Sequence, residues 1–592
     1  MIYTDKQVLV LGLGESGLAM ARWLRYCGAR VRVADTRATP PRLPQLLELA
    51  ASAGPAVEFV AGELNATLLP GIDFIAVSPG LAPRLELANI LPSAQEMNLP
   101  VWSEIELFAQ ALASLKVPET KGESAAQATA AVSPISPDAA VTVDASAEDA
   151  AERVAESVAE DVAEVAAELP VLEATPIAEA KGYCPKIIAI TGTNGKTTVT
   201  SMVGLLCSRA GLTVQVAGNI SPAALDVLLD ALQNDRLPQV WVLELSSFQL
   251  HFTYSLQADA ATVLNLTQDH LDWHLDMQEY ASDKARIFSA HTVRVLNRED
   301  AVVLAMQAPK VAPVIVKKGT PIAEQEPVPF TPEMISFGCN VPQQLGCFGL
   351  TNERGVQWLS EAVLLDENAE PPKRRKKGEV APPPELTLKH LMPADALKVR
   401  GQHNAANALA ALALCRAIGL PYAPLLHALR DYQGEPHRVE LVRMLGDVAW
   451  YDDSKGTNVG ATVAALKGLG GELSHSGEAS RRLVLIAGGV GKDQDFSPLA
   501  EPVARYVRSV VLFGRDAPAI TQALQECGVS LLQAQSNVQD AVQMASDAAQ
   551  PGDVVLFSPA CASFDMFNNY VHRAQVFVDC VNELAMARGE LV

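Results

Sequence analysis

The sequence contains no cysteine pattern that would hold a metal ion or build a disulfide framework. Its nine cysteines are scattered over 592 residues, without a C-x-x-C pair or zinc spacing, so reduced thiols are expected. No apolar run is long enough to cross a bilayer, and the first six residues lack the layout of a signal peptide. We therefore expect a cytoplasmic protein without membrane insertion.

Positive charge is also scarce. The chain has 46 Lys and Arg against 68 Asp and Glu, a formal net charge of −22, which argues against a nucleic-acid partner. Residues 118–181 hold 14 acidic and 3 basic side chains, so their net charge of −11 is half of the total. This stretch has almost no aromatic residues. We predict that 117–182 is an acidic, Ala- and Glu-rich tether, either disordered or a solvated helix, with a docking helix for a partner as the alternative.

Outside the tether, short apolar runs alternate with helical patterns, which predicts an α/β fold with mostly parallel sheets. Breaks in this alternation divide the chain into three successive α/β domains at 1–116, 183–433 and 434–592, with the tether between the first two. Strands are predicted at 7–11, 30–34, 74–77, 187–190, 240–244, 261–265, 448–451, 483–487, 509–513 and 554–557.

The central domain carries an insertion at 366–384. It contains the run KRRKK at 373–377, between pairs of prolines. A nucleic-acid patch is one interpretation. A solvated loop is favoured in so acidic a chain.

The segment at 187–198 reads IIAITGTNGKTT, which predicts a strand, a glycine-rich turn and a helix. Such a turn lets backbone N–H groups and a helix N-terminus surround phosphate oxygens. Lys196 can then reach the terminal phosphates, and the Thr197 hydroxyl can bind Mg²⁺. The general nucleotide-binding spacing requires glycine where this chain has Ile190, so the match to that pattern is imperfect.

A second glycine-rich turn, GLGESG at 12–17, follows the first predicted strand, and Asp35 closes the second strand. This arrangement fits a phosphate on a helix N-terminus and a carboxylate on a nucleoside. A dinucleotide or a nucleotide sugar would satisfy it. An NAD-dependent dehydrogenase is therefore the rival enzyme, although it leaves the loop at 191–198 unexplained.

Polar groups also follow later strands, where ligands of α/β sheets gather. Glu244 is a candidate Mg²⁺ ligand, with a capping role as the alternative, and His270 is a candidate ligand or base. In the third domain, three loops offer cations, hydroxyls and amides at 452–458, 488–493 and 558–563. Cys561 could be a nucleophile, but no histidine follows in a recognisable layout, and packing is favoured.

Eight motifs occur in one order along the chain. They read TGTNGKT at 191–197, GNI at 218–220, ELSSFQ at 244–249, DH at 269–270, GQHN at 401–404, PHR at 436–438, DSKGTN at 453–458 and SPACAS at 558–563. Together they resemble the Mur ligase family. The turn at 12–17 and the run DTR at 35–37 are similar to the D-glutamate-adding branch of that family.

The resemblance implies Rossmann-like first and third domains and a central P-loop ATPase-type domain. It also implies ATP-dependent amide synthesis through an acyl phosphate, with UDP-N-acetylmuramoyl-L-alanine and D-glutamate as the other substrates, in peptidoglycan precursor synthesis. The cofactor would be Mg²⁺ at two sites, with Lys284 carbamylated. We expect a monomer. Other ligases of the superfamily, and a scaffold built on the tether, are alternatives.

The resemblance also assigns roles by position. The catalytic residues would be Lys196, His270 and Lys284, and the metal ligands Thr197, Glu244, His270 and Lys284. ATP would be bound by Gly192, Thr193, Asn194, Gly195, Lys196, Thr197, Thr198, Asn404, Asn407, Arg438, Asp453 and Lys455. The UDP-sugar would be bound by Ser16, Asp35, Thr36, Arg37 and Asn219, and D-glutamate by Thr457, Lys492, Ser563 and Tyr570. Tyr570 departs mildly from the family, which has Phe there.

Overall fold

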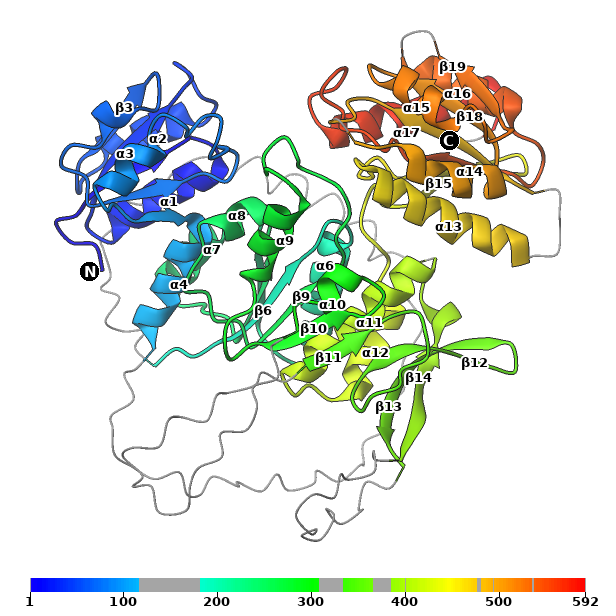
Figure 1. The fold of residues 1–592 in the computed structure, drawn as a ribbon, viewed down its shortest axis with the longest axis horizontal. Coiled ribbons are helices and arrows are strands. Elements are labelled where there is room, and N and C mark those ends of the chain that lie inside the picture. The colour runs from blue at the N-terminus through cyan, green and yellow to red at the C-terminus, as the bar shows by residue number, and fades with distance from the viewer. Residues whose placement is uncertain are drawn as a thin grey trace, which may run out of the picture.

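The computed structural model describes residues 2–116, 182–307, 334–365, 385–399, 401–475, 481–492, 494–534 and 537–590. The predicted tether, except Gly182, and the insertion at 366–384 lie outside these residues. Within them, three α/β units follow one another along the chain, with the central unit between the other two (Figure 1). The predicted α/β fold class is confirmed.

The N-terminal unit is built on a parallel sheet in the order β3-β2-β1-β4-β5. Its strands β1 and β4 are buried along almost their whole length because helices cover both faces, which is why they are nearly continuous apolar runs in the sequence. The strands are β1 Gln7–Leu11, β2 Arg30–Asp35, β3 Val57–Ala61, β4 Phe74–Val77 and β5 Val101–Ser103, and the helices are α1 Glu15–Tyr26, α2 Leu43–Ala51, α3 Leu91–Glu96 and α4 Glu104–Leu115.

The central unit has a parallel sheet in the order β11-β10-β9-β6-β8-β7. The strand that precedes the phosphate loop, β6, lies inside this sheet. The strands are β6 Lys186–Thr191, β7 Val214–Gly218, β8 Val240–Glu244, β9 Ala260–Val263, β10 Val293–Asn297 and β11 Met334–Phe337. The helices are α6 Lys196–Arg209, α7 Ala224–Gln233, α8 Ser247–His251, α9 Met277–Ala285, α10 Ala301–Leu304, α11 Gln402–Ala417 and α12 Tyr422–Asp431.

The central unit also carries an antiparallel sheet that the sequence analysis did not predict. It is made of β12 Phe348–Glu353, β13 Val356–Leu364 and β14 Leu386–Pro393. The turn between β12 and β13 has positive φ at Arg354 and Gly355, +54° and +84°, which is the backbone of a tight two-residue hairpin. Leu365 N donates to Glu385 O, so the two ends of the insertion at 366–384 meet.

The C-terminal unit has six strands in the order β15-β16-β20-β17-β18-β19, of which only β15 is antiparallel to its neighbour. The strands are β15 Glu440–Leu445, β16 Val448–Asp452, β17 Leu483–Gly488, β18 Val507–Phe513, β19 Ser530–Gln533 and β20 Val554–Phe557. The helices are α13 Val459–His475, α14 Ala500–Tyr506, α15 Ala517–Leu524, α16 Val538–Ala548 and α17 Tyr570–Ala587.

Helix α4 joins the first two units. It packs beside α7 of the central unit, and the Phe108 ring meets the Trp241 ring edge-on at 5.0 Å. Gly182 N and Tyr183 N both donate to Leu115 O, so the two ends of the predicted tether lie together. The chain therefore leaves the junction at Leu115 and returns to it at Gly182, so the residues between do not set the distance between the units.

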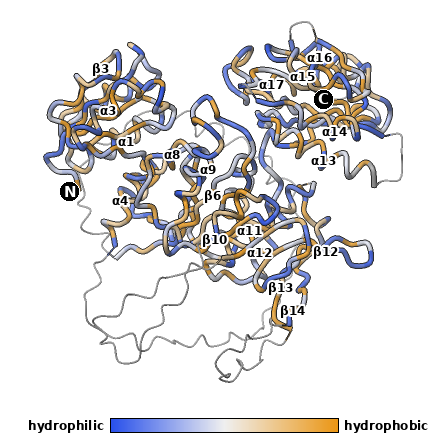
Figure 2. The backbone as a smooth tube through the Cα atoms, in the orientation of Figure 1, coloured by the Kyte–Doolittle hydropathy of each residue, from blue (hydrophilic) through white to orange (hydrophobic). Residues whose placement is uncertain are grey.

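The predicted strands are confirmed with small shifts. The strand predicted at 261–265 ends at Val263 instead, because Asn265 turns back toward the phosphate loop, where its Oδ1 accepts a hydrogen bond from Asn194 N. Apolar segments run through the interior of each unit, and the tip beyond β12 is hydrophilic (Figure 2). No helix among the described residues is long and apolar enough to span a membrane.

Candidate active site

The phosphate loop connects β6 to α6 in the central unit. Gly192 and Gly195 have φ values of +151° and +83°, and a Cβ on Gly195 would lie 2.8 Å from the Asn407 side-chain oxygen. Lys196 Nζ donates to the carbonyls of Gly192 and Thr193 at 3.0 and 2.9 Å. Its ammonium group therefore lies over the loop, at the position where a loop-bound phosphate would be neutralised.

Lys284 reaches the same loop from α9. Its Nζ donates to Thr191 Oγ1 at 3.2 Å and to Gly192 O at 2.9 Å, and the side chain is almost fully buried. Burial, with Lys196 nearby, lowers the pKa of Lys284 well below its usual range. The two lysines predicted to be catalytic thus share one carbonyl acceptor, Gly192 O.

Glu244 ends β8 beside this loop, as the sequence predicted. Its Oε1 accepts from Asn219 Nδ2 at 2.9 Å, and its carbonyl accepts from Asn219 N at 2.7 Å. Its Oε2 is buried and has no hydrogen-bond partner among the described residues. A buried carboxylate oxygen without a hydrogen-bond partner fits a ligand of Mg²⁺, which prefers oxygen.

His270 follows β9 in the left-handed region, at φ +57°. Its Nε2 lies 3.5 Å from Asp269 Oδ2, and its ring meets the Phe248 ring at 4.8 Å. Burial lowers the pKa of His270 to about 4. The imidazole is therefore neutral, which is the form that binds metals.

The C-terminal unit adds cations to the same place. Arg438 Nη2 and Lys455 Nζ donate to Thr197 Oγ1 at 3.1 and 3.2 Å, and Lys492 Nζ lies 3.5 Å from Asp269 Oδ1. Burial lowers the pKa of Lys455 to about 8. Basic side chains of the C-terminal unit therefore face the first turn of α6, which follows the phosphate loop of the central unit.

The remaining predicted residues lie around this centre. Thr193 Oγ1 lies 3.1 Å from the Tyr280 hydroxyl, and Thr198 is buried within α6. Asn407 Nδ2 donates to Asn404 Oδ1 at 3.2 Å on α11. Asp453 accepts from Ser558 Oγ at 2.6 Å, and burial raises its pKa to about 7.

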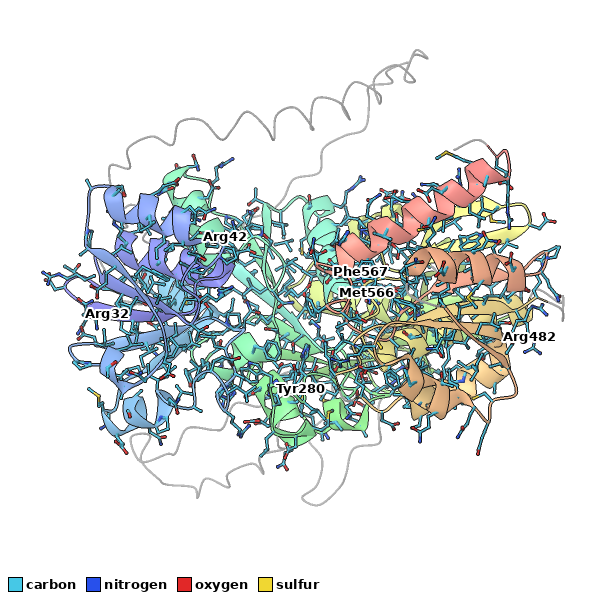
Figure 3. All side chains as sticks on the ribbon, turned by 90° about the horizontal axis from the view of Figure 1, so that it is seen from above. Arg32, Arg42, Tyr280, Arg482, Met566 and Phe567 are labelled. Carbon is cyan, nitrogen blue, oxygen red and sulfur yellow. The ribbon has the colours of Figure 1, made fainter. Side chains whose placement is uncertain are left out.

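Three of the residues predicted to bind D-glutamate, Thr457, Lys492 and Ser563, lie on loops of the C-terminal unit, and Tyr570 is the first residue of α17. Thr457 and Tyr570 are half-buried and Ser563 is buried, while the Tyr570 ring lies 5.5 Å from Lys455 Nζ. Cys561 is fully buried, which raises the pKa of its thiol to about 12 and agrees with the packing role favoured above. Seen from above, Arg32 and Arg482 lie at opposite outer sides and Tyr280 lies between them (Figure 3).

The turn at 12–17 borders a cavity of about 420 Å³ in the N-terminal unit, lined among others by Ser16, Asp35, Thr36 and Arg37. Burial would raise the pKa of Asp35, but hydrogen bonds from Arg37 and Leu13 N lower it to about 2. Asp35 therefore fixes the turn and Arg37 as well as facing the cavity. A Cβ on Gly17 would lie 1.9 Å from Gly12 O, so only glycine fits there.

Three family models match successive parts of the chain: "Mur ligase MurD-like, N-terminal domain" at 6–101, "Mur ligase middle domain" at 190–321 and "Mur ligase, glutamate ligase domain" at 437–561. The proteins named UDP-N-acetylmuramoylalanine--D-glutamate ligase from Burkholderia pseudomallei strain 668 and from Burkholderia thailandensis are 49% and 50% identical to it. Each alignment covers 99% of this chain and 99% of the relative.

The chain belongs to the Mur ligase family. Among solved structures, UDP-N-acetylmuramate-alanine ligase from Thermotoga maritima aligns with a TM-score of 0.47 at 16% identity, over 98% of this chain and 99% of that chain. The assignment rests on the sequence matches.

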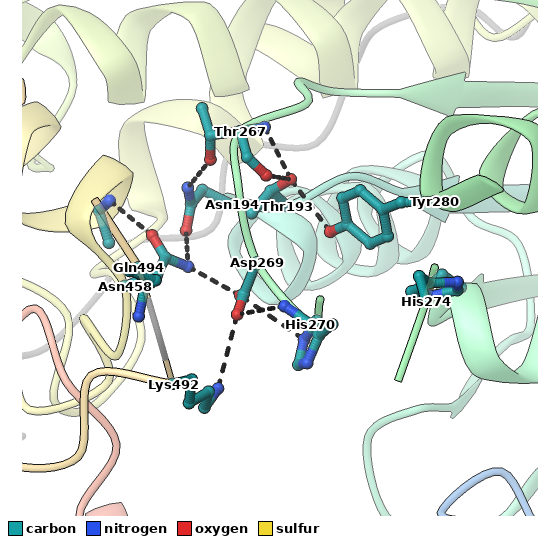
Figure 4. Close-up of polar contacts among 12 residues, drawn as sticks. Thr193, Asn194, Thr267, Asp269, His270, His274, Tyr280, Asn458, Lys492 and Gln494 are labelled. Carbon is teal, nitrogen blue, oxygen red and sulfur yellow. Dashed lines mark hydrogen bonds and ion pairs between the residues drawn. The ribbon is translucent and has the colours of Figure 1, made fainter. Parts of the chain in front are cut away.

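Two further residues of this Mur ligase, Asp269 and Asn458, lie at the centre of the site, although the motifs that contain them predict no individual role for either. Asp269 contacts His270, Lys492 and Asn458, and Asn458 also reaches Asn194 (Figure 4). The position of Asp269 beside His270 was a usable signal. Asn458 gave none, because its partners lie more than 180 residues away in the sequence.

Proposed function

We propose that this protein is the ATP-dependent ligase that joins D-glutamate to UDP-N-acetylmuramoyl-L-alanine in peptidoglycan precursor synthesis. The observation that carries the proposal is the convergence of Lys196, Arg438 and Lys455 at the phosphate loop, from two units of the chain. Full-length relatives with that name, at 49–50% identity, support the choice of substrates.

The first step would transfer the γ-phosphoryl group of ATP to the alanyl carboxylate, with ADP leaving. Charge on the transferring group would be neutralised by Lys196 and by the basic side chains that face Thr197. Thr197, Glu244, His270 and Lys284 would hold Mg²⁺ at two sites. When bound, Mg²⁺ supplies positive charge to the phosphate oxygens. Asn404, Asn407 and Asp453 would orient the nucleotide.

In the second step the amine of D-glutamate would attack the acyl carbon, phosphate would leave, and the amine would lose a proton. Thr457, Lys492, Ser563 and Tyr570 would hold the amino acid. Lys492 already contacts Asp269 next to His270. The amino acid would therefore arrive at the side of the phosphate loop where the acyl phosphate forms.

The UDP end would occupy the cavity of about 420 Å³ at Ser16, Asp35, Thr36 and Arg37. Asn219 would lie toward the sugar, since it is held on Glu244 beside the phosphate loop while the nearby Ser221 Oγ donates to Glu15 of the turn at 12–17. A dehydrogenase is disfavoured, because it would use this cavity and leave the phosphate loop and the C-terminal unit without a role. A monomer, a cytoplasmic location and the domain limits at 116, 182 and 433 stay predictions.

We propose further that Lys284 works as a carbamate. Its buried amine lacks a carboxylate partner among the described residues, and its pKa is lowered. The neutral form of the amine, which is the form that reacts with CO₂, is therefore favoured. A carbamate would turn a donor into the oxygen ligand that Mg²⁺ prefers. We expect Lys284→Ala to be nearly inactive and to regain activity with a small added carboxylate. Full activity of this variant in CO₂-depleted buffer would contradict the role.

The test of the function is phosphate release from ATP with each substrate omitted or replaced in turn. We expect release only with UDP-N-acetylmuramoyl-L-alanine and D-glutamate together, and little with L-glutamate, L-lysine or the alanine-free UDP-sugar. Equal rates with a dibasic amino acid would assign the chain to another branch of the family. Reduction of NAD with no ATP use would overturn the proposal.

A further inference from the structure

Asn458 is the side chain through which the C-terminal unit holds the phosphate loop. Its Oδ1 accepts from Ala461 N at 2.9 Å, which caps the start of α13. Its Nδ2 donates to Asn194 Oδ1 at 3.0 Å and to Asp269 Oδ2 at 3.2 Å, both in the central unit (Figure 4). The Asn458 side chain is only 4% exposed, and its bond to Asp269 is buried and so shielded from water.

Only an amide satisfies this arrangement. The side chain must accept a hydrogen bond within its own unit and donate to two acceptors across the junction, one of which is a carboxylate. A carboxylate of the same shape could still cap α13. It would, however, face Asp269 with a like charge and leave Asn194 Oδ1 without a donor.

The packing around Asn458 is equally close. A Cβ on Gly460 would lie 2.8 Å from Thr267 Oγ1 and 3.1 Å from Asn194 Nδ2. The first turn of α13 therefore lies directly on the phosphate loop and on the segment after β9. A shift of α13 would be felt by both.

The same turn is tied to the loop that carries Lys492. Gln494 Oε1 accepts from Val459 N at 3.0 Å, and its Nε2 donates to Gly491 O at 2.7 Å. Lys492 reaches Asp269, which Asn458 also contacts. The position of α13 thus sets where Lys492 lies relative to the phosphate loop.

We propose that Asn458 is a positioning residue, whose amide registers the C-terminal unit against the phosphate loop so that the amino-acid site faces the acyl phosphate. Its kinetic consequences rest on the function proposed above. The UDP-sugar is bound by the other two units, so its binding does not depend on this contact. The amino acid and the phosphates lie across the contact, and they do depend on it.

The kinetic test compares Asn458→Asp with Asn537→Ala. Asn537 is a matched control, because its Oδ1 caps α16 of the same unit through Asp540 N but makes this bond within the unit. For Asn458→Asp we expect kcat/KM for D-glutamate to fall about tenfold to hundredfold, with KM for the UDP-sugar unchanged. Asn537→Ala should change neither. Wild-type kinetics in Asn458→Asp would overturn the proposal, as would equal losses in both variants.

A second measurement does not need activity. Amide hydrogen exchange of the intact protein should be faster in Asn458→Asp around residues 192–197 and 267–271, because the contact that holds the junction is lost. Exchange along the interior of α13 should stay slow, because the introduced carboxylate still caps it. Unchanged exchange at the junction would overturn the proposal. If exchange were faster in Asn458→Asp as expected, but the wild type had no ligase activity, only the proposed function would fail.

Discussion

The central unit meets its two neighbours in different ways. Toward the N-terminal unit, one apolar core is continuous across the junction, and Phe108 of α4 packs on Trp241 of β8 within it. The buried carboxylates of Glu104 and Glu106 on α4 accept hydrogen bonds from backbone N–H groups of the central unit, at Leu225, Tyr254 and Ser255. This junction is built like the interior of a single domain.

Toward the C-terminal unit, the side-chain contacts described above are polar. They join the phosphate loop and Asp269 to Arg438, Lys455, Asn458 and Lys492. The apolar clusters of the C-terminal unit contain no central-unit residue. A polar junction of this kind contributes little hydrophobic free energy and presents charge to a ligand. The first junction maintains the fold, and the second assembles the chemistry.

The largest effect is expected at the polar junction. Lys196→Ala removes the cation over the loop, which should lower ATP-dependent phosphate release on the order of 10³-fold or more, while the melting profile stays that of the wild type. Phosphate-release assays and calorimetry check both. Near-normal turnover would mean that the junction does not serve phosphoryl transfer.

The apolar junction predicts a loss of stability instead. Phe108→Ala should destabilise the N-terminal and central units together by about 3–5 kcal/mol and leave the C-terminal transition in place. Phe577→Ala is the matched control, since its ring stacks on Phe557 at 4.4 Å inside the C-terminal core. That variant should shift only the C-terminal transition. Calorimetric transitions that move equally in both variants would contradict the comparison.

Glu104 gives the apolar junction a pH dependence. Burial raises the pKa of Glu104 from its usual 4.5 to about 7, although Leu225 N donates to it. The folded protein therefore loses stability as pH rises from about 4.5 to about 7. Glu104→Gln keeps an acceptor for Leu225 N without the charge, so it should be more stable than the wild type at pH 8, by up to about 3 kcal/mol.

Urea unfolding at several pH values checks this expectation. The difference between the two proteins should disappear below about pH 4.5, where both side chains are neutral. Glu106→Gln serves as the contrast. It should destabilise at neutral pH, because Glu106 accepts two backbone hydrogen bonds at Oε2 and two side-chain hydrogen bonds at Oε1, whereas Gln has only one acceptor oxygen. A Glu104→Gln variant less stable than the wild type at pH 8 would refute the account.

The smallest effect is expected from the acidic segment. Because Leu115 O accepts from both Gly182 N and Tyr183 N, about ten Gly and Ser residues in place of 120–180 should reconnect the chain without moving either unit. We expect kcat to change little. A loss comparable to that of Lys196→Ala would make the segment a working part.

Much of this architecture could be read from the sequence. Buried parallel strands leave continuous apolar runs, so β1, β4, β8 and β20 were located within a residue. The phosphate loop was recognisable because its glycines and Lys196 are adjacent in the chain. The antiparallel sheet was missed, although Gly355 between the segments at 348–353 and 356–364 was a local signal for the hairpin turn.

The parts that escaped prediction depend on contacts between distant segments. Nothing local indicates that Asn458 crosses to Asn194, or that α4 belongs as much to the central unit as to the first. Asp35 was expected to bind the ligand, yet it also accepts hydrogen bonds from Leu13 N and from the Arg37 side chain. The contacts of Asn458 and α4 follow from how the units approach one another, and the second role of Asp35 follows from how β1 and β2 lie side by side within one unit.

The central claim is that residues at the polar junction catalyse the formation of an acyl phosphate from ATP and the alanyl carboxylate. It is tested most directly with UDP-N-acetylmuramoyl-L-alanine labelled with ¹⁸O in the alanyl carboxylate. If the carboxylate oxygen attacks the γ-phosphorus, the phosphate released after amide formation should carry one ¹⁸O by mass spectrometry. Unlabelled phosphate, released together with the amide product, would contradict the account.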